Sequence, residues 1–228
     1  MQASDRLIVA ADFSTRDDIL RLADEMHGVA GLIKIGLQAF IANGPGLVRE
    51  IAGRGEKIFL DLKLHDIPNT VAHAAAEAAS LGAAMLTVHA AGGEAMLRAA
   101  ASDRLLVLGV TILTSLGESD LEQIGFTGTA ITNAVRLAAL AKKAGLGGVV
   151  ASPLEIEAIR AACGLELRIV TPGIRPNGEP RGDQQRTMSP ADAIRAGADY
   201  IVVGRPITAA ANRRDAAAKI VDEMEGAG

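Results

Sequence analysis

Short runs of apolar residues recur along the chain, and each is followed by a stretch in which apolar and charged positions alternate at helical spacing, as in Arg16–Ala23. The runs are rich in Val, Ile and Leu, which is typical of strands buried on both faces of a parallel sheet. They are Leu7–Ala11, Leu32–Ile35, Lys57–Leu62, Ala84–Val88, Leu105–Ile112, Gly147–Ala151, Leu167–Val170 and Tyr200–Val203.

Eight strand–helix units in 228 residues predict an α/β protein with a single (β/α)8 TIM barrel, a fold that begins at about 200 residues. A doubly wound sheet would give the same alternation, but eight units favour a closed barrel. No linker rich in Pro, Gly or Ser separates two halves, so residues 1–228 are predicted to be one domain.

The composition and the net charge of the chain argue against some classes of function. The 43 Ala and only 2% aromatic residues predict a core of small and branched side chains, with helices packed closely on strands. A formal net charge of -4 argues against a general nucleic-acid surface. The longest run without Asp, Glu, Lys or Arg, Ala78–Gly93, is shorter than the roughly 20 residues of a membrane-spanning helix. We therefore expect a cytoplasmic protein that binds neither nucleic acid nor membrane.

Ionisable residues gather where the predicted strands end, and in a barrel these ends form the active-site face. Lys34 lies inside an apolar run, where an ammonium is costly to bury unless it is paired; an edge-strand surface lysine is the alternative. Period-two alternation puts Asp61 and Lys63 on one face, and each ammonium would keep its carboxylate neighbours ionised; a surface ion-pair ladder is the alternative. The residues concerned are Asp12, Asp61, Lys63, Asp66 and His89, at or just beyond the strand ends, and Lys34 within its run.

An anion site is predicted after the last strand. Gly204 would let the backbone approach a ligand, Pro206 suits a first helical turn, and Arg205 could grip a phosphate together with the N–H groups at the helix start. An ordinary turn with a solvated arginine is the alternative. The segment Gly197–Asp199, just upstream, is predicted to be a turn.

Two connections, Thr114–Thr129 and Pro172–Pro190, are longer than the scaffold needs. The second lies where a barrel builds its active-site face, so a mobile lid at 172–190 is predicted, with a solvated insertion as the alternative. The histidines lack the spacing of a metal site, and Cys163, the single cysteine, has no neighbouring base. We therefore expect neither a catalytic metal nor a covalent nucleophile.

The motifs together closely resemble those of the bacterial-type orotidine 5′-phosphate decarboxylases, from about Leu7 to Thr208. The strongest match is Asp61–Thr70, an extended Asp-x-Lys-x-x-Asp signature. The short signature is shared with sugar-phosphate decarboxylases and aldolases, whereas the Ile-Pro-Asn-Thr extension is more specific. Supporting matches are Ala11–Phe13, Ile33–Gly36, Leu113–Ser115, Thr171–Pro176, Gly182–Gln184 and Val203–Pro206.

The resemblance implies a (β/α)8 homodimer with active sites at the dimer interface. It implies conversion of orotidine 5′-monophosphate to uridine 5′-monophosphate (UMP) and CO2, the last step of de novo pyrimidine synthesis, with no metal or organic cofactor.

The resemblance also implies roles for single residues. Lys34, Asp61, Lys63 and Asp66 would form the catalytic network. Asp66 and Thr70 would reach into the neighbouring subunit's site. The residues expected to bind substrate are Asp12 and Lys34 at the ribose, Thr114 or Ser115 at the pyrimidine, Arg175, Gln184, Gly204 and Arg205 at the phosphate, and also Asp61 and Pro172.

Two rival functions are open. A 3-keto-sugar-phosphate decarboxylase or hexulose-phosphate synthase would share Asp61, Lys63 and Asp66 but would use a divalent metal. A non-catalytic phosphate-binding barrel would keep Gly204 and Arg205 without needing the full charge network.

Overall fold

The structure, a computed structural model, describes residues 1–176 and 187–226. Within this part of the chain, eight parallel strands pair in sequence order, and β1 pairs with β8 to close the sheet. The predicted (β/α)8 barrel is therefore confirmed. The strands are β1 (Leu7–Ala10), β2 (Leu32–Gly36), β3 (Ile58–Leu64), β4 (Ala83–His89), β5 (Leu106–Val110), β6 (Gly148–Val150), β7 (Arg168–Thr171) and β8 (Tyr200–Val203).

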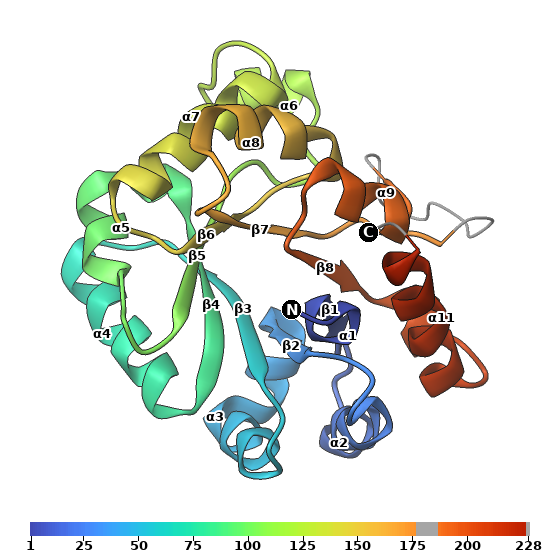
Figure 1. Cartoon of the computed structure of the whole chain (residues 1–228). Helices are drawn as coiled ribbons and strands as arrows, with labels where there is room; N and C mark the ends of the chain where they lie inside the picture. Colours follow the sequence, from blue (N-terminus) through green and yellow to red (C-terminus); the bar gives the residue numbers. More distant parts are fainter. Residues whose placement is uncertain (177–186, 227–228) are drawn as a thin grey trace.

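Helices surround the strands, and Figure 1 shows them arranged around the outside of the barrel. The connection Thr114–Thr129 contains a short helix of its own, α6. The helices are α1 (Ala3–Arg6), α2 (Arg16–Met26), α3 (Leu37–Gly53), α4 (Pro68–Ser80), α5 (Glu94–Ala100), α6 (Glu118–Gln123), α7 (Ala130–Lys143), α8 (Ile156–Cys163), α9 (Pro190–Ala196), α10 (Arg205–Thr208) and α11 (Arg213–Glu225), with 3-10 turns η1 (Ala90–Gly92) and η2 (Pro153–Glu155).

Alternate residues of each strand point into the barrel, and these inward positions form two layers with different chemistry. Leu32, Phe59 and Met85 belong to a buried apolar cluster inside the barrel. Two residues further along the same strands, period-two alternation returns the chain to the interior at Lys34, Asp61 and Thr87. The apolar layer therefore lies deeper in the barrel, and the polar layer lies next to it, at the carboxyl ends of the strands.

The outward strand positions pack against the helices through small side chains. A Cβ added at Gly109 of β5 would lie 3.2 Å from the Cβ of Ala141 on α7 and 3.4 Å from that of Ala90. Contacts this short leave no room for larger residues between helix and strand. The high alanine content thus serves the close helix–strand packing that the composition predicts.

A partly buried ionic cluster joins β7 and β8 at the opposite end of the barrel from the polar layer. Asp199 accepts hydrogen bonds from Arg160, from the Arg168 Nη1 atom at 2.8 Å and from the Ile169 backbone N–H at 2.8 Å. Gly197, with φ of 108°, ends α9 in the left-handed conformation. The predicted turn is therefore present, but Asp199 also has a structural role that the turn prediction missed.

The ends of the predicted lid connection are held together. Ile174 and Met188 form an isolated parallel bridge, and the Arg175 N–H donates to the Met188 carbonyl at 3.0 Å. Residues 177–186, which include most of the predicted lid, lie outside the described residues. Within the described ranges, no helix combines the length and the apolar character that crossing a lipid bilayer requires.

Candidate active site

A cavity of about 460 Å³ opens at the carboxyl ends of the strands, above the apolar layer. Nine residues predicted from the sequence for this site line it, together with apolar side chains of β5, β6 and β8; the nine are Asp12, Lys34, Asp61, Lys63, Thr114, Pro172, Arg175, Gly204 and Arg205. The other lining residues are Ala10, Phe59, Val110, Ile112, Leu113, Val150, Ala151, Gly173 and Val202.

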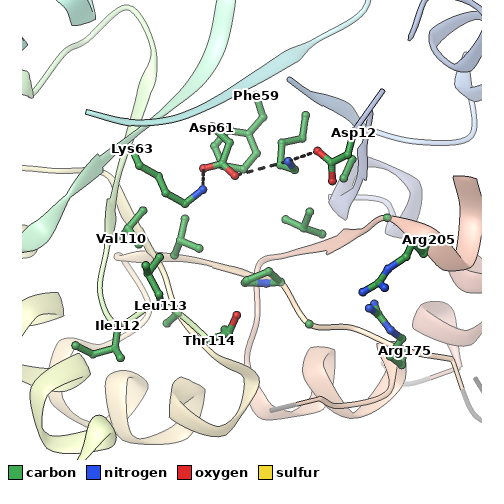
Figure 2. Close-up of a pocket in the computed structure, with 18 residues that line it drawn as sticks. Asp12, Phe59, Asp61, Lys63, Val110, Ile112, Leu113, Thr114, Arg175 and Arg205 are labelled. Carbon is green, nitrogen blue, oxygen red and sulfur yellow. Dashed lines mark hydrogen bonds and ion pairs between the residues drawn. The ribbon is translucent and has the colours of Figure 1, made fainter. Parts of the chain in front are cut away.

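Four charges of alternating sign run across one side of the cavity. The Lys34 Nζ atom lies 3.0 Å from Asp12 Oδ1 and 3.7 Å from Asp61 Oδ2. Asp61 Oδ1 in turn accepts a hydrogen bond from Lys63 Nζ at 2.8 Å (Figure 2). Lys34 is therefore a buried, paired lysine facing the barrel interior, and the surface-lysine alternative is wrong.

The two ammonium groups keep Asp61 ionised although its side chain is only 16% exposed. Burial raises the pKa of Asp61, but Lys34 and Lys63, with hydrogen bonds from Lys63 and Thr87, lower it by more. The net result is a pKa below the ordinary 3.8. Asp61 is thus a carboxylate at neutral pH, placed beside a lysine that faces the cavity.

This shift predicts how Asp61 contributes to acid stability. Its pKa in the folded protein lies below its unfolded value of about 3.9, so its contribution is complete above that value and is lost as the pH falls through the folded pKa. We expect the free energy of unfolding of the native protein, minus that of Asp61→Asn, to shrink as the pH falls below about 4. Urea titrations across this range measure the difference, and a difference independent of pH would contradict the assignment.

The opposite end of the cavity is cationic. Arg175 follows β7 and Arg205 opens α10 after β8, and Figure 2 shows both side chains at the end of the cavity away from Lys63. Thr114, which follows β5, lies on the wall between the two ends, and Val110 and Ile112 make the wall near Lys63 apolar. The cavity therefore suits an elongated ligand that has an anionic group at one end and a less polar ring at the other.

Several predicted residues lie elsewhere. Asp66 and Thr70 are exposed and do not line the cavity; Asp66 Oδ1 accepts from the Ile67 N–H at 2.7 Å. Ser115 is likewise exposed, so of the two residues expected at a pyrimidine, Thr114 is the one that lines the cavity. Gln184 lies outside the described residues.

His89, at the end of β4, stands beside His65, with ring centroids 5.5 Å apart. Burial lowers the pKa of His89 below the ordinary 6.5, and the nearby His65 and Lys63 lower it further, which outweighs the effect of Asp61. His89 is therefore neutral at pH 7 and adds no positive charge next to Lys63. Within the described residues, no group of three or more His, Cys, Asp and Glu side chains is placed to hold a metal ion.

The sequence reasoning did not single out two residues that the fold brings to the site. Phe59 is buried and forms part of the cavity floor, and Thr87 is fully buried and hydrogen-bonded to Asp61 at 3.0 Å. A signal for Thr87 was present, because it is the one hydroxyl side chain within the apolar run Ala84–Val88.

Chemically, the arrangement combines three capabilities. Two guanidinium groups can bind a phosphate, the Asp12–Lys34 pair can exchange hydrogen bonds with hydroxyl groups, and the Lys63 ammonium can stabilise negative charge and donate a proton. Apolar residues also line the cavity near Lys63, and a less polar surrounding strengthens the electrostatic effect of its ammonium.

The chain is similar to known proteins over nearly its whole length. The orotidine 5′-phosphate decarboxylase of Moorella thermoacetica is 49% identical to this chain, with 99% of this chain and 94% of that protein covered. That of Anaeromyxobacter dehalogenans is 51% identical, with 91% and 92% covered.

The chain is also similar to solved structures of orotidine 5′-phosphate decarboxylases. The crystal structure of orotidine 5′-phosphate decarboxylase from Lactobacillus acidophilus matches with a TM-score of 0.86 and 33% identity, covering 96% of this chain and 98% of that one. The enzyme from Pyrococcus horikoshii matches with a TM-score of 0.81 and 29% identity, covering 96% and 99%. The sequence profile of the orotidine 5′-phosphate decarboxylase / HUMPS family matches residues 5–220, nearly the whole barrel with both ends of the cavity. With this fold, this cavity and these relatives, the chain belongs to the orotidine 5′-phosphate decarboxylase / HUMPS family.

Proposed function

We propose that this protein is a carboxy-lyase that converts orotidine 5′-monophosphate to UMP and CO2, the last step of de novo pyrimidine synthesis. Family membership and relatives with this activity in their names support the reaction. The observation that carries the proposal is the two-ended cavity, with Arg175 and Arg205 at one end and the Asp61–Lys63 pair at the other. Phosphate, ribose and pyrimidine would then follow one another from the arginines to Lys63.

The chemical step requires positive charge at one carbon. When the bond to the departing carboxylate breaks, its electron pair stays on the pyrimidine ring carbon as CO2 leaves. The Lys63 ammonium would stabilise that carbanion and then transfer a proton to it, becoming an amine. Because Asp61 holds Lys63 at 2.8 Å before substrate arrives, the charge is already oriented and little reorganisation is needed during the reaction.

The remaining residues have binding roles in this proposal. Asp12 and Lys34 would hold the ribose hydroxyls, Thr114 would meet the pyrimidine edge, and Arg175, Gly204 and Arg205 would bind the phosphate, with Gln184 expected to join them. Enzymes lower barriers by about 8–23 kcal/mol, more than one hydrogen bond supplies. Binding energy from the phosphate end must therefore contribute to the chemistry at the other end.

We also propose that the working form is a homodimer with shared active sites, in which Asp66 and Thr70 serve the partner's cavity. Both are exposed and outside the cavity of their own chain. Two exposed apolar residues come soon after the neighbouring strands β2 and β3. Leu37 directly follows β2 and is 49% exposed, and Ile67 lies three residues after the end of β3 and is 65% exposed. Large exposed apolar residues are common at association surfaces.

The activity itself is tested by mixing the protein with orotidine 5′-monophosphate and a strong chelator and following the loss of orotate absorbance. We expect turnover to UMP and CO2 at a rate that the chelator does not change, because the proposed charge network acts without metal or organic cofactor. Activity abolished by the chelator and restored by a divalent cation would favour the metal-dependent sugar-phosphate reactions.

The phosphate assignment makes a separate prediction for Arg205. Arg205→Ala should lower kcat/KM for orotidine 5′-monophosphate by at least about 10- to 100-fold, because a hydrogen bond to a charged group contributes about 1.5–3 kcal/mol. The same change should barely affect the slow reaction of orotidine, which has no phosphate. Measuring kcat/KM for both substrates separates the roles; equal proportional losses would mean that Arg205 supports the scaffold.

A further inference from the structure

Strand β3 is irregular at the point where it enters the cavity. Leu60 pairs with Leu86 of β4 and Leu64 pairs with Val88, so three residues of β3, Asp61 to Lys63, stand opposite the single residue Thr87. This is a bulge, a feature that re-aims side chains and is common next to active sites. Among the residues that the structure describes, Lys63 is the only non-glycine residue with a positive φ, 51°.

The hydroxyl of Thr87 occupies the gap that the bulge leaves in the ladder. The Lys63 backbone N–H donates to Thr87 Oγ1 at 2.8 Å, and Thr87 Oγ1 donates to Asp61 Oδ1 at 3.0 Å. One hydroxyl can donate one hydrogen bond while it accepts another, so both contacts can exist together. Thr87 is fully buried, so water does not compete for either.

These contacts form a closed ring of hydrogen bonds that includes Lys63. From the Lys63 N–H the ring runs to Thr87, then to Asp61, and back to the Lys63 Nζ atom, which donates to the same Oδ1 atom of Asp61 at 2.8 Å. Both ends of Lys63, its backbone and its ammonium, are therefore oriented through one hydroxyl.

We propose that Thr87 is a positioning residue, whose hydroxyl holds the bulged backbone of Lys63 and the carboxylate of Asp61 in the geometry required for decarboxylation. The inference rests on the proposed function for its catalytic consequence, although the contacts themselves do not. Thr87 does not line the cavity, so it acts through Asp61 and Lys63 rather than on substrate. Small misplacements of a reacting group are enough to slow a reaction severely.

The kinetic test compares Thr87→Val, which keeps the shape and removes the hydroxyl, with Thr87→Ser, which keeps the hydroxyl. Thr87→Val should lower kcat by about 10- to 100-fold, because hydrogen bonds to charged groups are the strong ones. Its KM should change by less than about threefold, because the phosphate and ribose contacts remain. Thr87→Ser should restore most of kcat. If Thr87→Val does not fold, Thr87→Cys replaces it, since a thiol is only a weak hydrogen-bond partner.

Thr171 provides a matched control, because it is also fully buried in a barrel strand and its hydroxyl has no hydrogen-bond partner within the described residues. Its neighbour Val170 faces the barrel interior, so Thr171 points toward the helices. Thr171→Val should leave kcat and KM unchanged. Equal kcat losses in Thr87→Val and Thr87→Ser, or a native kcat in Thr87→Val, would overturn the proposal.

A second readout does not depend on activity. Hydrogen exchange of the Lys63 amide, measured by NMR, should be faster in Thr87→Val than in the native protein, and close to native in Thr87→Ser and Thr171→Val. If the native protein fails to decarboxylate orotidine 5′-monophosphate, the proposed function is wrong, and this measurement still decides whether Thr87 holds the bulge. An unchanged exchange rate in Thr87→Val would show that it does not.

Discussion

Replacing Lys63 with alanine should lower kcat for orotidine 5′-monophosphate by more than about 10⁴-fold while the barrel remains folded. The loss combines two effects of the ammonium, proton donation, which contributes about 10²–10⁴-fold, and stabilisation of charge in the transition state, which contributes about 10²–10³-fold. Folding should persist because the Lys63 side chain is 30% exposed, and Asp61 keeps Lys34 as a counter-charge at 3.7 Å. Steady-state kinetics and thermal unfolding measure the two properties.

Lys57 offers a control on the same segment of chain. It is exposed and immediately precedes β3, at the opposite end of the strand from Lys63. Lys57→Ala removes the same ammonium and should leave kcat within about twofold, because surface substitutions away from a site usually have small effects. A folded Lys63→Ala variant that turns over at a rate near that of the native protein would remove Lys63 from the proposed mechanism.

Mixing two inactive variants should restore activity if the active sites are shared between subunits. In a mixed dimer of Lys63→Ala and Asp66→Asn subunits, one site would carry both changes and the other neither. With random exchange half of the dimers are mixed, so about a quarter of all sites should be intact. The measurement is kcat per site after the subunits have been unfolded together and refolded, with mixed dimers verified by two different affinity tags.

A second pair of variants controls for nonspecific rescue. Lys34 and Lys63 line the same cavity of one chain, so a mixed dimer of Lys34→Ala and Lys63→Ala subunits has a damaged residue in each site. This mixture should stay inactive. Verified mixed dimers of the first pair that are no more active than their parents would contradict the assignment of Asp66 to the partner's site.

The barrel could be predicted because strands buried on both faces must be apolar throughout, and eight such runs stand out between charged helices. The run Tyr200–Val203 is β8 without change, and the other runs locate their strands to within two residues. The run Leu105–Ile112 was too long because β5 ends at Val110, its last ladder partner on β6 being Val150. An apolar pattern predicts which residues are buried, whereas a strand also needs backbone hydrogen bonds to a neighbouring strand.

Lys34 and the Asp61–Lys63 pair could be predicted for a related reason. An ammonium inside an apolar run must be paired, so the sequence alone points to nearby carboxylates. It does not say which carboxylates they are. Asp12 lies 22 positions from Lys34 and becomes its partner at 3.0 Å because Ala10 of β1 stands in register with Lys34 of β2.

Local patterns of apolar and charged residues therefore predict the barrel, the polar strand ends and the cationic strand-to-helix turn. The Asp12–Lys34–Asp61–Lys63 order, the bulge in β3 and the position of Thr87 between Asp61 and Lys63 arise only when β1 to β4 are in register. Regular alternation predicts that Asp61 and Lys63 share a face, and both line the cavity. The positive φ of Lys63 could not be predicted from that alternation. The local pattern of apolar and polar residues predicts which side chains are buried, whereas the distances between residues of different strands depend on how those strands pair.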